Sequence, residues 1–132
     1  MIRRLAQSEN YVVEHEYETV FLSSKNKRLL VIGDFYGDPE VAVIDRDEKW
    51  CAMGGCGVIV YWLEEPFSPY QYDISRSQYF ELHRTKSDIW WIETIKQLGP
   101  NEIDVRLAGG KSYRISFDRS KPEPIPQVKA LA

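Results

Sequence analysis

Both cysteines of the chain, Cys51 and Cys56, lie in the stretch W-C-A-M-G-G-C-G-V-I-V-Y-W, which also holds three of the eight glycines. A redox pair would need the spacing C-x-x-C, whereas the spacing here is C-x4-C. A structural zinc site needs four ligands, usually in two closely spaced pairs. The two histidines, His15 and His83, satisfy the number of ligands in a Cys2His2 site but not their spacing. We therefore predict no metal site and no cofactor.

Cys56 is the candidate nucleophile of the chain. A nucleophile elbow requires glycine two positions before and two positions after the reactive residue. Gly54 meets the first requirement, but Val58 occupies the second position. A reactive cysteine also needs a base, for which His83 is the candidate. The carboxylates and amides that could orient this histidine are Asp73, Asp88 and Asn101.

The same glycines also allow a structural interpretation. They do not form a phosphate-binding loop, because no Lys-Ser/Thr follows them and the next segment is strand-like. Glycine inside a strand marks a bend or a close backbone contact, and free cysteine behaves as a small buried apolar residue. We therefore interpret M-G-G-C-G as a bend in a strand, through which Val58–Leu63 enters a core that covers both of its faces.

Acidic residues are concentrated between Asp34 and Lys49, where six carboxylates accompany two basic residues. Aromatic residues lie in or beside the same segments, which we predict as the loops Gly33–Glu40, Asp45–Trp50 and Glu64–Asp73. Aspartate favours turns in any case, so these loops can simply be solvated turns. Aromatic anchors framed by charge are also typical of a protein interface. The predicted partner-binding residues are Asp34, Tyr36, Asp38, Asp45, Asp47, Glu48, Trp50, Trp62, Glu64 and Tyr70.

Composition excludes several classes of protein. The 132 residues suit one domain, and a hydrophobic fraction of 43% argues against disorder. The net charge of −3 argues against affinity for a phosphate backbone, so we expect no nucleic acid partner. The N-terminus lacks an apolar signal region, and the longest apolar run is far too short to span a membrane. We expect a cytoplasmic protein, with its oligomeric state left open.

Period-two alternation, turn signals and β-branched residues predict about eight strands. They lie at 12–21, 29–32, 41–44, 58–63, 78–83, 89–95, 102–107 and 112–117. The predicted fold is a mainly β, antiparallel sandwich or partly open barrel with at most one or two short helices, at 2–9 or 84–89. We predict one domain over 1–118, followed by an extended tail over 119–132 that contains Pro122, Pro124 and Pro126.

The runs G-D-F-Y-G-D-P-E-V-A-V-I-D and K-W-C-A-M-G-G-C-G-V-I-V-Y resemble small bacterial immunity proteins of polymorphic and contact-dependent toxin systems. The resemblance implies a cytosolic, non-enzymatic protein that binds and neutralises a cognate toxin, and many such toxins are cationic nucleases. It assigns no role to individual residues. Our sequence-based hypothesis is accordingly a protein-binding module that contacts its partner through the acidic, aromatic loops. The alternative is a small β-barrel enzyme or ligand-binding protein that uses Cys56 and His83 or a tyrosine-lined pocket.

Overall fold

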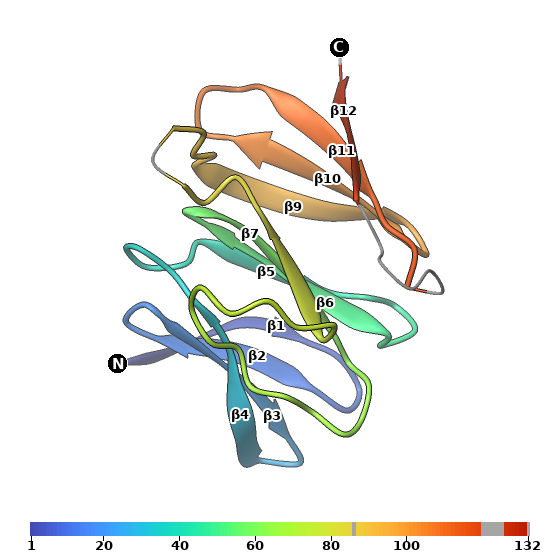
Figure 1. Ribbon diagram of the computed structural model, residues 1–132. Helices are drawn as coiled ribbons and strands as arrows, with labels where there is room; N and C mark the ends of the chain where they lie inside the picture. The colour runs from blue at the N-terminus through green and yellow to red at the C-terminus, as the bar shows by residue number, and fades with distance from the viewer. Residues whose placement is uncertain (86, 120–125, 132) are drawn as a thin grey trace.

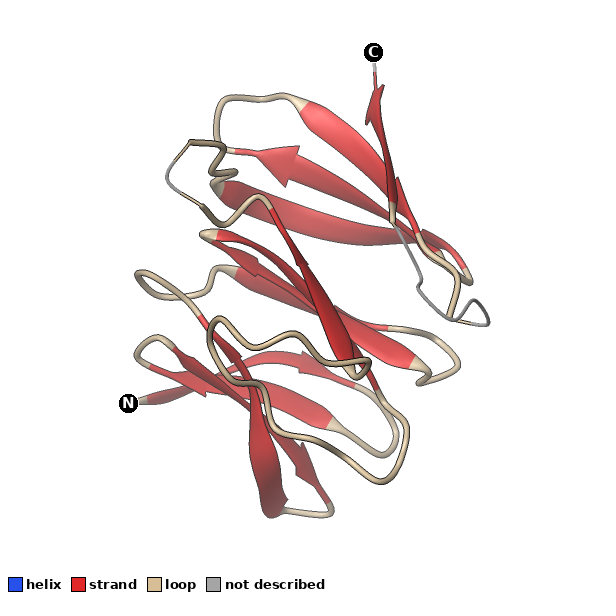
Figure 2. Ribbon diagram, viewed as in Figure 1, coloured by secondary structure: helices blue, strands red, loops and turns tan. Residues whose placement is uncertain are grey.

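The computed structural model describes residues 1–85, 87–119 and 126–131. This part of the chain consists of β-strands joined by loops and contains no helix (Figure 2). The strands are β1 (Ile2–Gln7), β2 (Val12–Glu16), β3 (Thr19–Ser24), β4 (Lys27–Asp34), β5 (Val41–Ile44), β6 (Trp50–Gly55), β7 (Gly57–Trp62), β8 (Tyr79–Leu82), β9 (Ile92–Gly99), β10 (Glu102–Leu107), β11 (Ser112–Ser116) and β12 (Gln127–Leu131).

The strands form three antiparallel sheets of four, in the orders β1-β2-β3-β4, β5-β6-β7-β8 and β12-β11-β10-β9. Each sheet is a meander in which strands that follow one another in the chain also pair, as short connections favour. The sheets stack in chain order, with β5–β8 between the other two (Figure 1). The prediction of a mainly β, antiparallel sandwich is confirmed. The sandwich has three layers, and none of the three sheets closes into a barrel.

The middle sheet is buried on both faces, as the apolar run Val58–Leu63 predicted. Side chains alternate across a strand, so β6 and β7 supply two different cores. One core joins the middle sheet to the first sheet and the other joins it to the third. The middle-sheet residues of the first core include Cys51, Met53, Ile59 and Tyr61, and those of the second include Trp50, Ala52, Val58, Val60 and Trp62.

The segment V-V-E-H-E-Y-E-T-V-F is not the single strand that its alternation predicted. It is a hairpin, because the chain turns at Tyr17 and Glu18 between β2 and β3, and Tyr17 has a φ of 54°. The segment contains none of the glycine, proline or asparagine residues that usually mark a turn. Beyond the turn the faces exchange, so Val20 lies in the first core while Phe21 lies 3.6 Å beneath the guanidinium carbon of Arg28.

The glycine-rich stretch is likewise a hairpin and not a bend within one strand. Trp50 pairs with Trp62 and Gly55 pairs with Gly57, so the chain reverses at Cys56. Gly57 has a φ of +85°, and a Cβ atom there would lie 2.1 Å from Cγ of Arg84. Glycine is therefore required at this turn. The cysteines themselves are free and buried, as the structural interpretation predicted.

Two further predictions are corrected. Residues 2–7, where a helix was considered, form strand β1, and no helix occurs in the described part of 84–89. Residues 127–131 were assigned to a tail, but they form β12, which pairs with β11. The third sheet therefore extends beyond the predicted domain end at residue 118. Pro122 and Pro124 lie outside the described residues.

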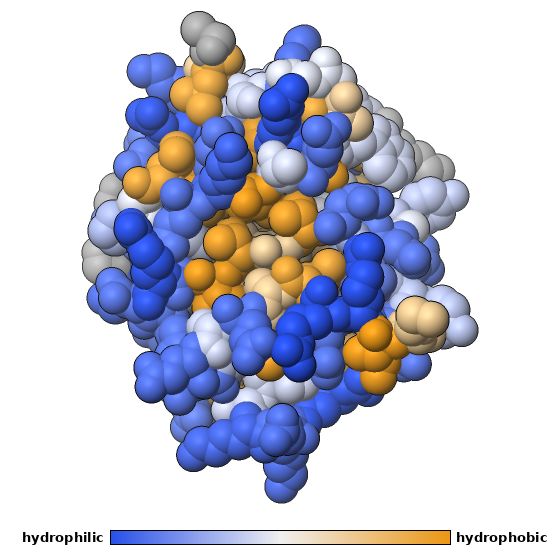
Figure 3. Space-filling model, turned by 180° about the vertical axis from the view of Figure 1, so that it is seen from behind, coloured by the Kyte–Doolittle hydropathy of each residue, from blue (hydrophilic) through white to orange (hydrophobic). Residues whose placement is uncertain are grey.

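Strand β5 forms a partly exposed apolar strip on the side that faces away in Figure 1. Figure 3 shows an apolar patch there, surrounded by hydrophilic residues. The patch lies where β5 runs between β1 and β9. Among the described strands β5 pairs with β6 alone, and its four residues are half-buried. The free edge of the middle sheet is thus part of the protein surface.

Candidate functional site

The strand register gives the middle sheet two chemically different ends. β6 and β7 join at Cys56, β5 begins opposite Gly54, and β8 ends opposite Val58. The loop 35–40 before β5 and the described residues 83–85 and 87–91 after β8 therefore lie at the same end as Cys56. The turns 45–49 and 99–101 lie at the other end, which we call the turn end.

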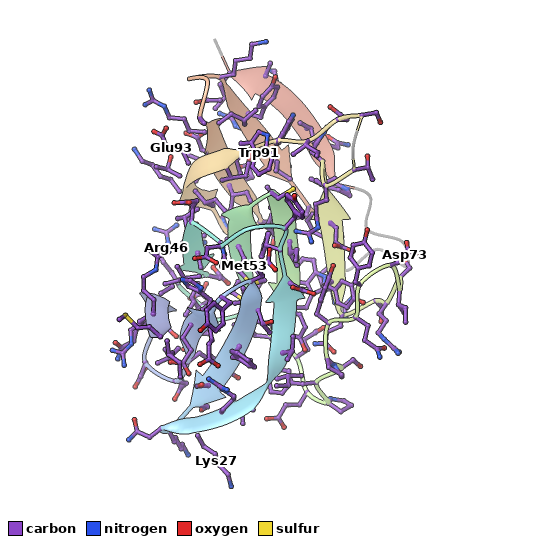
Figure 4. All side chains as sticks on the ribbon, turned by 90° about the vertical axis from the view of Figure 1, so that its left-hand side faces the viewer. Lys27, Arg46, Met53, Asp73, Trp91 and Glu93 are labelled. Atoms are coloured by element: carbon purple, nitrogen blue, oxygen red, sulfur yellow. The ribbon has the colours of Figure 1, made fainter. Side chains whose placement is uncertain are left out.

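Four aromatic side chains are exposed at the Cys56 end. The exposed fractions are 73% for Tyr17, 78% for Tyr36, 74% for Tyr72 and 51% for Trp91, and no other aromatic side chain among the described residues is classed as exposed. We call this end the aromatic end. Figure 4 looks onto it, with Trp91 between Glu93 and Asp73.

Backbone contacts position these aromatic residues on four separate segments. Trp91 forms an isolated antiparallel bridge with Cys56, which fixes the indole beside the β6–β7 turn. The amide of Phe35 donates to the carbonyl of Glu18 over 2.9 Å, so the β2–β3 turn lies against the loop that carries Tyr36. Tyr72 belongs to the long β7–β8 loop, which is tied to strand β4 through Tyr70 N and Val31 O, 2.9 Å apart.

Three of the four exposed aromatic residues, Tyr36, Tyr72 and Trp91, line a pocket of about 490 Å³. We call it the Asp34 pocket; it is lined by Glu18, Asp34, Phe35, Tyr36, Cys56, Tyr72, Arg84, Ile89 and Trp91. Tyr36 and Trp91 also line a neighbouring hollow that reaches Glu40 and Glu93. Tyr72 lines another, which reaches His83 and Asp88. The aromatic end is thus a continuous, indented surface.

The side chain of Arg84 connects three segments of the chain at the Asp34 pocket. Its Nη1 donates to the carbonyl of Cys56 over 3.0 Å and its Nη2 to the carbonyl of Asp34 over 2.5 Å. Its Nε lies 2.9 Å from a carboxylate oxygen of Glu81, and the side chain is only 11% exposed. Three groups of the chain therefore hold the guanidinium, which ties β4 and β8 to the β6–β7 turn.

No protein-family model, no curated protein and no solved structure matches this chain. The site is therefore interpreted from its own chemistry. Residues 1–85, 87–119 and 126–131 contain no helix that could cross a lipid bilayer. The same residues contain no cluster of three or more His, Cys, Asp or Glu side chains arranged to hold a metal ion.

Four of the predicted partner-binding residues are buried and cannot contact a partner in this fold. Trp50 and Trp62 lie in the second core, where both rings pack edge-on against Phe117. Tyr70 lies in the first core and donates to Glu81 Oε1 over 2.6 Å. Burial raises the pKa of the Tyr70 hydroxyl, and the Glu81 acceptor raises it further. Asp45 is the fourth, and it accepts a 2.7 Å hydrogen bond from Gln97.

The remaining six predicted residues divide between the two ends. Asp34, Tyr36 and Asp38 lie at the aromatic end. Asp47, Glu48 and Glu64 lie at the turn end, where the side chain of Glu64 lies 2.8 Å from the guanidinium of Arg119. The Glu48 carboxylate accepts hydrogen bonds from Ser8 Oγ and from the backbone and side chain of Asn10, so it fixes the β1–β2 turn. The predicted loops therefore do not form one surface.

Tyr17, Tyr72 and Trp91 are absent from the predicted partner-binding residues. For Trp91 a signal was present, because adjacent residues of an extended segment point to opposite sides. In I-W-W-I this alternation places one tryptophan outward, and it is Trp91, whereas Trp90 is buried. Tyr17 had no comparable signal, because its exposure depends on a turn that the sequence does not mark.

The structure does not bring Cys56 and His83 into one cavity within the described residues. Cys56 lines the Asp34 pocket and the hollow at Glu93, whereas His83 lines the hollow at Asp88. The His83 ring stacks on Trp90, with centroids 3.7 Å apart. Its Nδ1 lies 2.7 Å from Asp88 Oδ2, which is an ion-pair distance without hydrogen-bond geometry. We find no nucleophile–base pair in this arrangement.

Exposed carboxylates surround the aromatic end. They are Glu18, Asp34, Asp38, Glu40, Asp73, Asp88 and Glu93. The basic side chain of the Asp34 pocket, Arg84, is already paired with Glu81. This end therefore presents aromatic rings within a field of negative charge, which suits a cationic surface.

Proposed function

We propose that the chain is a protein-binding module, an immunity-type inhibitor that acts in the bacterial cytoplasm by binding and neutralising a cationic toxin domain. Its contact surface is the aromatic end. The observation that supports this proposal is the gathering of Tyr17, Tyr36, Tyr72 and Trp91, each more than half exposed, at one end of the molecule. The resemblance of the glycine-rich segment to immunity proteins supports the class of partner.

Exposed aromatic side chains in a monomer usually mark a surface that a partner covers. Tyrosine and tryptophan are enriched among the residues that dominate binding energy, since each buries a large area and loses few rotamers. The acidic residues around them would attract a cationic partner and speed association. Both features lie on the same surface here, as an interface core and its charged rim require.

A toxin domain encoded beside the gene provides the test. The chain and this domain are mixed, and the dissociation constant is measured by calorimetry for the double variant Tyr36→Ala/Trp91→Ala. We expect affinity to fall by about 100-fold or more, since truncating central aromatic anchors typically costs ~2 kcal/mol or more each. Protection of cells that express the toxin should fall in parallel.

The matched control is the double variant Leu29→Ala/Leu98→Ala, which shortens two exposed apolar side chains outside the aromatic end. It should bind with unchanged affinity. Equal losses in the two double variants, or full affinity in the aromatic one, would show that the aromatic end is not the contact surface.

A further inference from the structure

We propose that the Asp34 pocket is the receptor for an arginine side chain of the partner protein. The inference rests on the proposed function, since it identifies what the aromatic end recognises. The pocket is concave and lies among the exposed rings, and its volume of about 490 Å³ is in the range of pockets that enclose a small ligand. Tyr36, Tyr72 and Trp91 line it.

Three aromatic residues of the pocket have polar groups that form no hydrogen bond with another described residue. Within the described part of the chain, the hydroxyls of Tyr36 and Tyr72 and the indole N–H of Trp91 make no hydrogen bond. Ring faces carry negative potential, so they attract a cation that comes within about 6 Å. The rings of this pocket can therefore bind a cationic side chain without breaking a hydrogen bond of the fold.

The charge of the pocket also favours a cation. The carboxylate of Asp34 makes no hydrogen bond or ion pair with another described residue. Glu18 uses one carboxylate oxygen to accept the amide of Gly37, 2.5 Å away, and its other oxygen makes no such contact. Because the charge of Arg84 is balanced by Glu81, these two carboxylates leave a negative charge on the pocket.

Arginine fits this combination better than lysine. The guanidinium is planar and weakly hydrated, so it can stack on a ring and bind a carboxylate through two parallel hydrogen bonds. The fold already makes the same contact with its own arginines. The guanidinium carbons of Arg28, Arg84 and Arg119 lie 3.6, 4.6 and 5.3 Å from the ring centroids of Phe21, Phe35 and Trp62.

The test is a titration of the full chain with N-acetyl-arginine N-methylamide, followed by NMR. We expect saturable binding with a dissociation constant of roughly 1–10 mM, and the indole signal of Trp91 should be the most perturbed. The citrulline analogue, which is uncharged and nearly isosteric, should bind at least about tenfold more weakly. The lysine analogue should fall between them.

The variant Asp34→Asn tests the carboxylate without disturbing the fold, because that side chain is exposed. We expect it to weaken binding of the arginine probe by about fivefold or more, while Asp47→Asn at the turn end should have no effect. Equal binding of the arginine and citrulline probes would overturn the inference in favour of a neutral small ligand. A lack of saturable binding at Trp91 would also overturn it.

The result of the arginine titration can be distinguished from the result of the toxin-binding test of the proposed function. If the Tyr36→Ala/Trp91→Ala variant loses the toxin domain but the arginine probe does not bind, the inference fails and the proposed function stands. If the probe binds and the toxin domain is still bound by that variant, the proposed contact surface is wrong, and the inference that a partner's arginine enters there falls with it.

Discussion

The guanidinium of Arg84 lies over the ring of Phe35, with its central carbon 4.6 Å from the ring centroid. The same guanidinium binds the carbonyls of Asp34 and Cys56 and the carboxylate of Glu81. One nearly buried cation thus connects the end of β4, the β6–β7 turn and the end of β8. The aromatic end depends on this connection, because its exposed rings are carried by loops.

Replacing Arg84 by methionine should destabilise the protein by about 2–3 kcal/mol. The substitution leaves the carbonyls of Cys56 and Asp34 without this donor, and the partly buried Glu81 loses its cation while keeping the hydrogen bond from Tyr70. Urea unfolding would measure the loss. The control is Arg114→Met, which removes a 3.7 Å contact between two exposed side chains and should cost less than about 0.5 kcal/mol. Similar losses in both variants would contradict the role assigned to Arg84.

Gly54 of the middle sheet packs closely against Ile92 of the third sheet. A Cβ atom there would lie 2.6 Å from Cγ2 and 2.9 Å from Cβ of Ile92. We expect Gly54→Ala to cost about 1–3 kcal/mol, because the methyl group must push two packed sheets apart. Gly109→Ala is the control, since nothing lies within 4 Å of the added atom. Thermal unfolding should show a lower midpoint for the first variant and an unchanged or slightly higher one for the second.

The strands of this fold were predictable where neighbouring residues suffice to specify them. Val41–Ile44 and 102–107 alternate or run apolar between clear turn signals, and both form strands at those positions. The burial of the middle sheet was predictable for the same reason, since a strand that is apolar at every position must be covered on both faces.

The site was less predictable because contacts with residues far along the chain determine which of its side chains are buried and which are exposed. Trp62 is a residue type that often anchors an interface, yet it is buried. Phe117, far along the chain, packs against it with the ring centroids 5.5 Å apart. Tyr36 is similar in chemistry and exposed, since no layer covers the loop that carries it. The two positions also differ locally, because Trp62 lies in the apolar run Val58–Leu63 whereas Tyr36 lies in a polar loop. The third sheet covers Trp62 but not Tyr36, and the position of this sheet is a long-range property of the fold.

Glu48 should make stability depend on pH at acidic values. Desolvation alone raises the pKa of its carboxyl, but the hydrogen bonds from Ser8 and Asn10 lower that pKa below its ordinary value. A depressed pKa adds stability above the unfolded-state pKa of about 4.3 and loses it as pH falls through the folded-state pKa. Glu48→Gln should therefore cost about 1 kcal/mol at pH 7 and nearly nothing near pH 3.

The free energy of unfolding of wild type and Glu48→Gln, measured by urea titration at several pH values, tests this expectation. Glu9→Gln serves as the control, because the exposed Glu9 side chain makes no hydrogen bond with another described residue. A difference between wild type and Glu48→Gln that stays constant from pH 7 to pH 3 would show that the hydrogen bonds do not depend on the carboxylate charge.

Charge reversal at the two ends of the molecule should have different effects on the rate of association with the partner. The pair Asp34→Lys/Asp38→Lys and the pair Asp47→Lys/Glu9→Lys change the net charge equally, but they lie at the aromatic end and the turn end. If the aromatic end faces a cationic partner, the first pair should slow association by about tenfold or more and flatten its dependence on salt. The second pair should have a much smaller effect, since screening acts over about 8–10 Å. Stopped-flow measurements at several salt concentrations would resolve the two, and equal effects would contradict the assigned orientation.

The two cysteines should differ in reactivity, and the difference bears on the enzyme alternative. Cys51 is fully buried, and this burial raises the pKa of its thiol. In the variant Cys56→Ser, which keeps Cys51, iodoacetamide should react only through global unfolding, at least about 1000-fold more slowly than with free cysteine. In Cys51→Ala, which keeps Cys56 at the floor of the Asp34 pocket, labelling should be faster because local opening suffices.

Labelling at Cys56 should remain slower than that of free cysteine, because this thiol is buried and no base pairs with it among the described residues. The adduct would also occupy the Asp34 pocket, so the labelled protein should bind the arginine probe at least about tenfold more weakly, while labelling of unrelated surface amines should not. Mass spectrometry of the time course gives the rates of both variants. A Cys56 that reacts at neutral pH faster than free cysteine would instead restore the interpretation of this residue as an activated nucleophile.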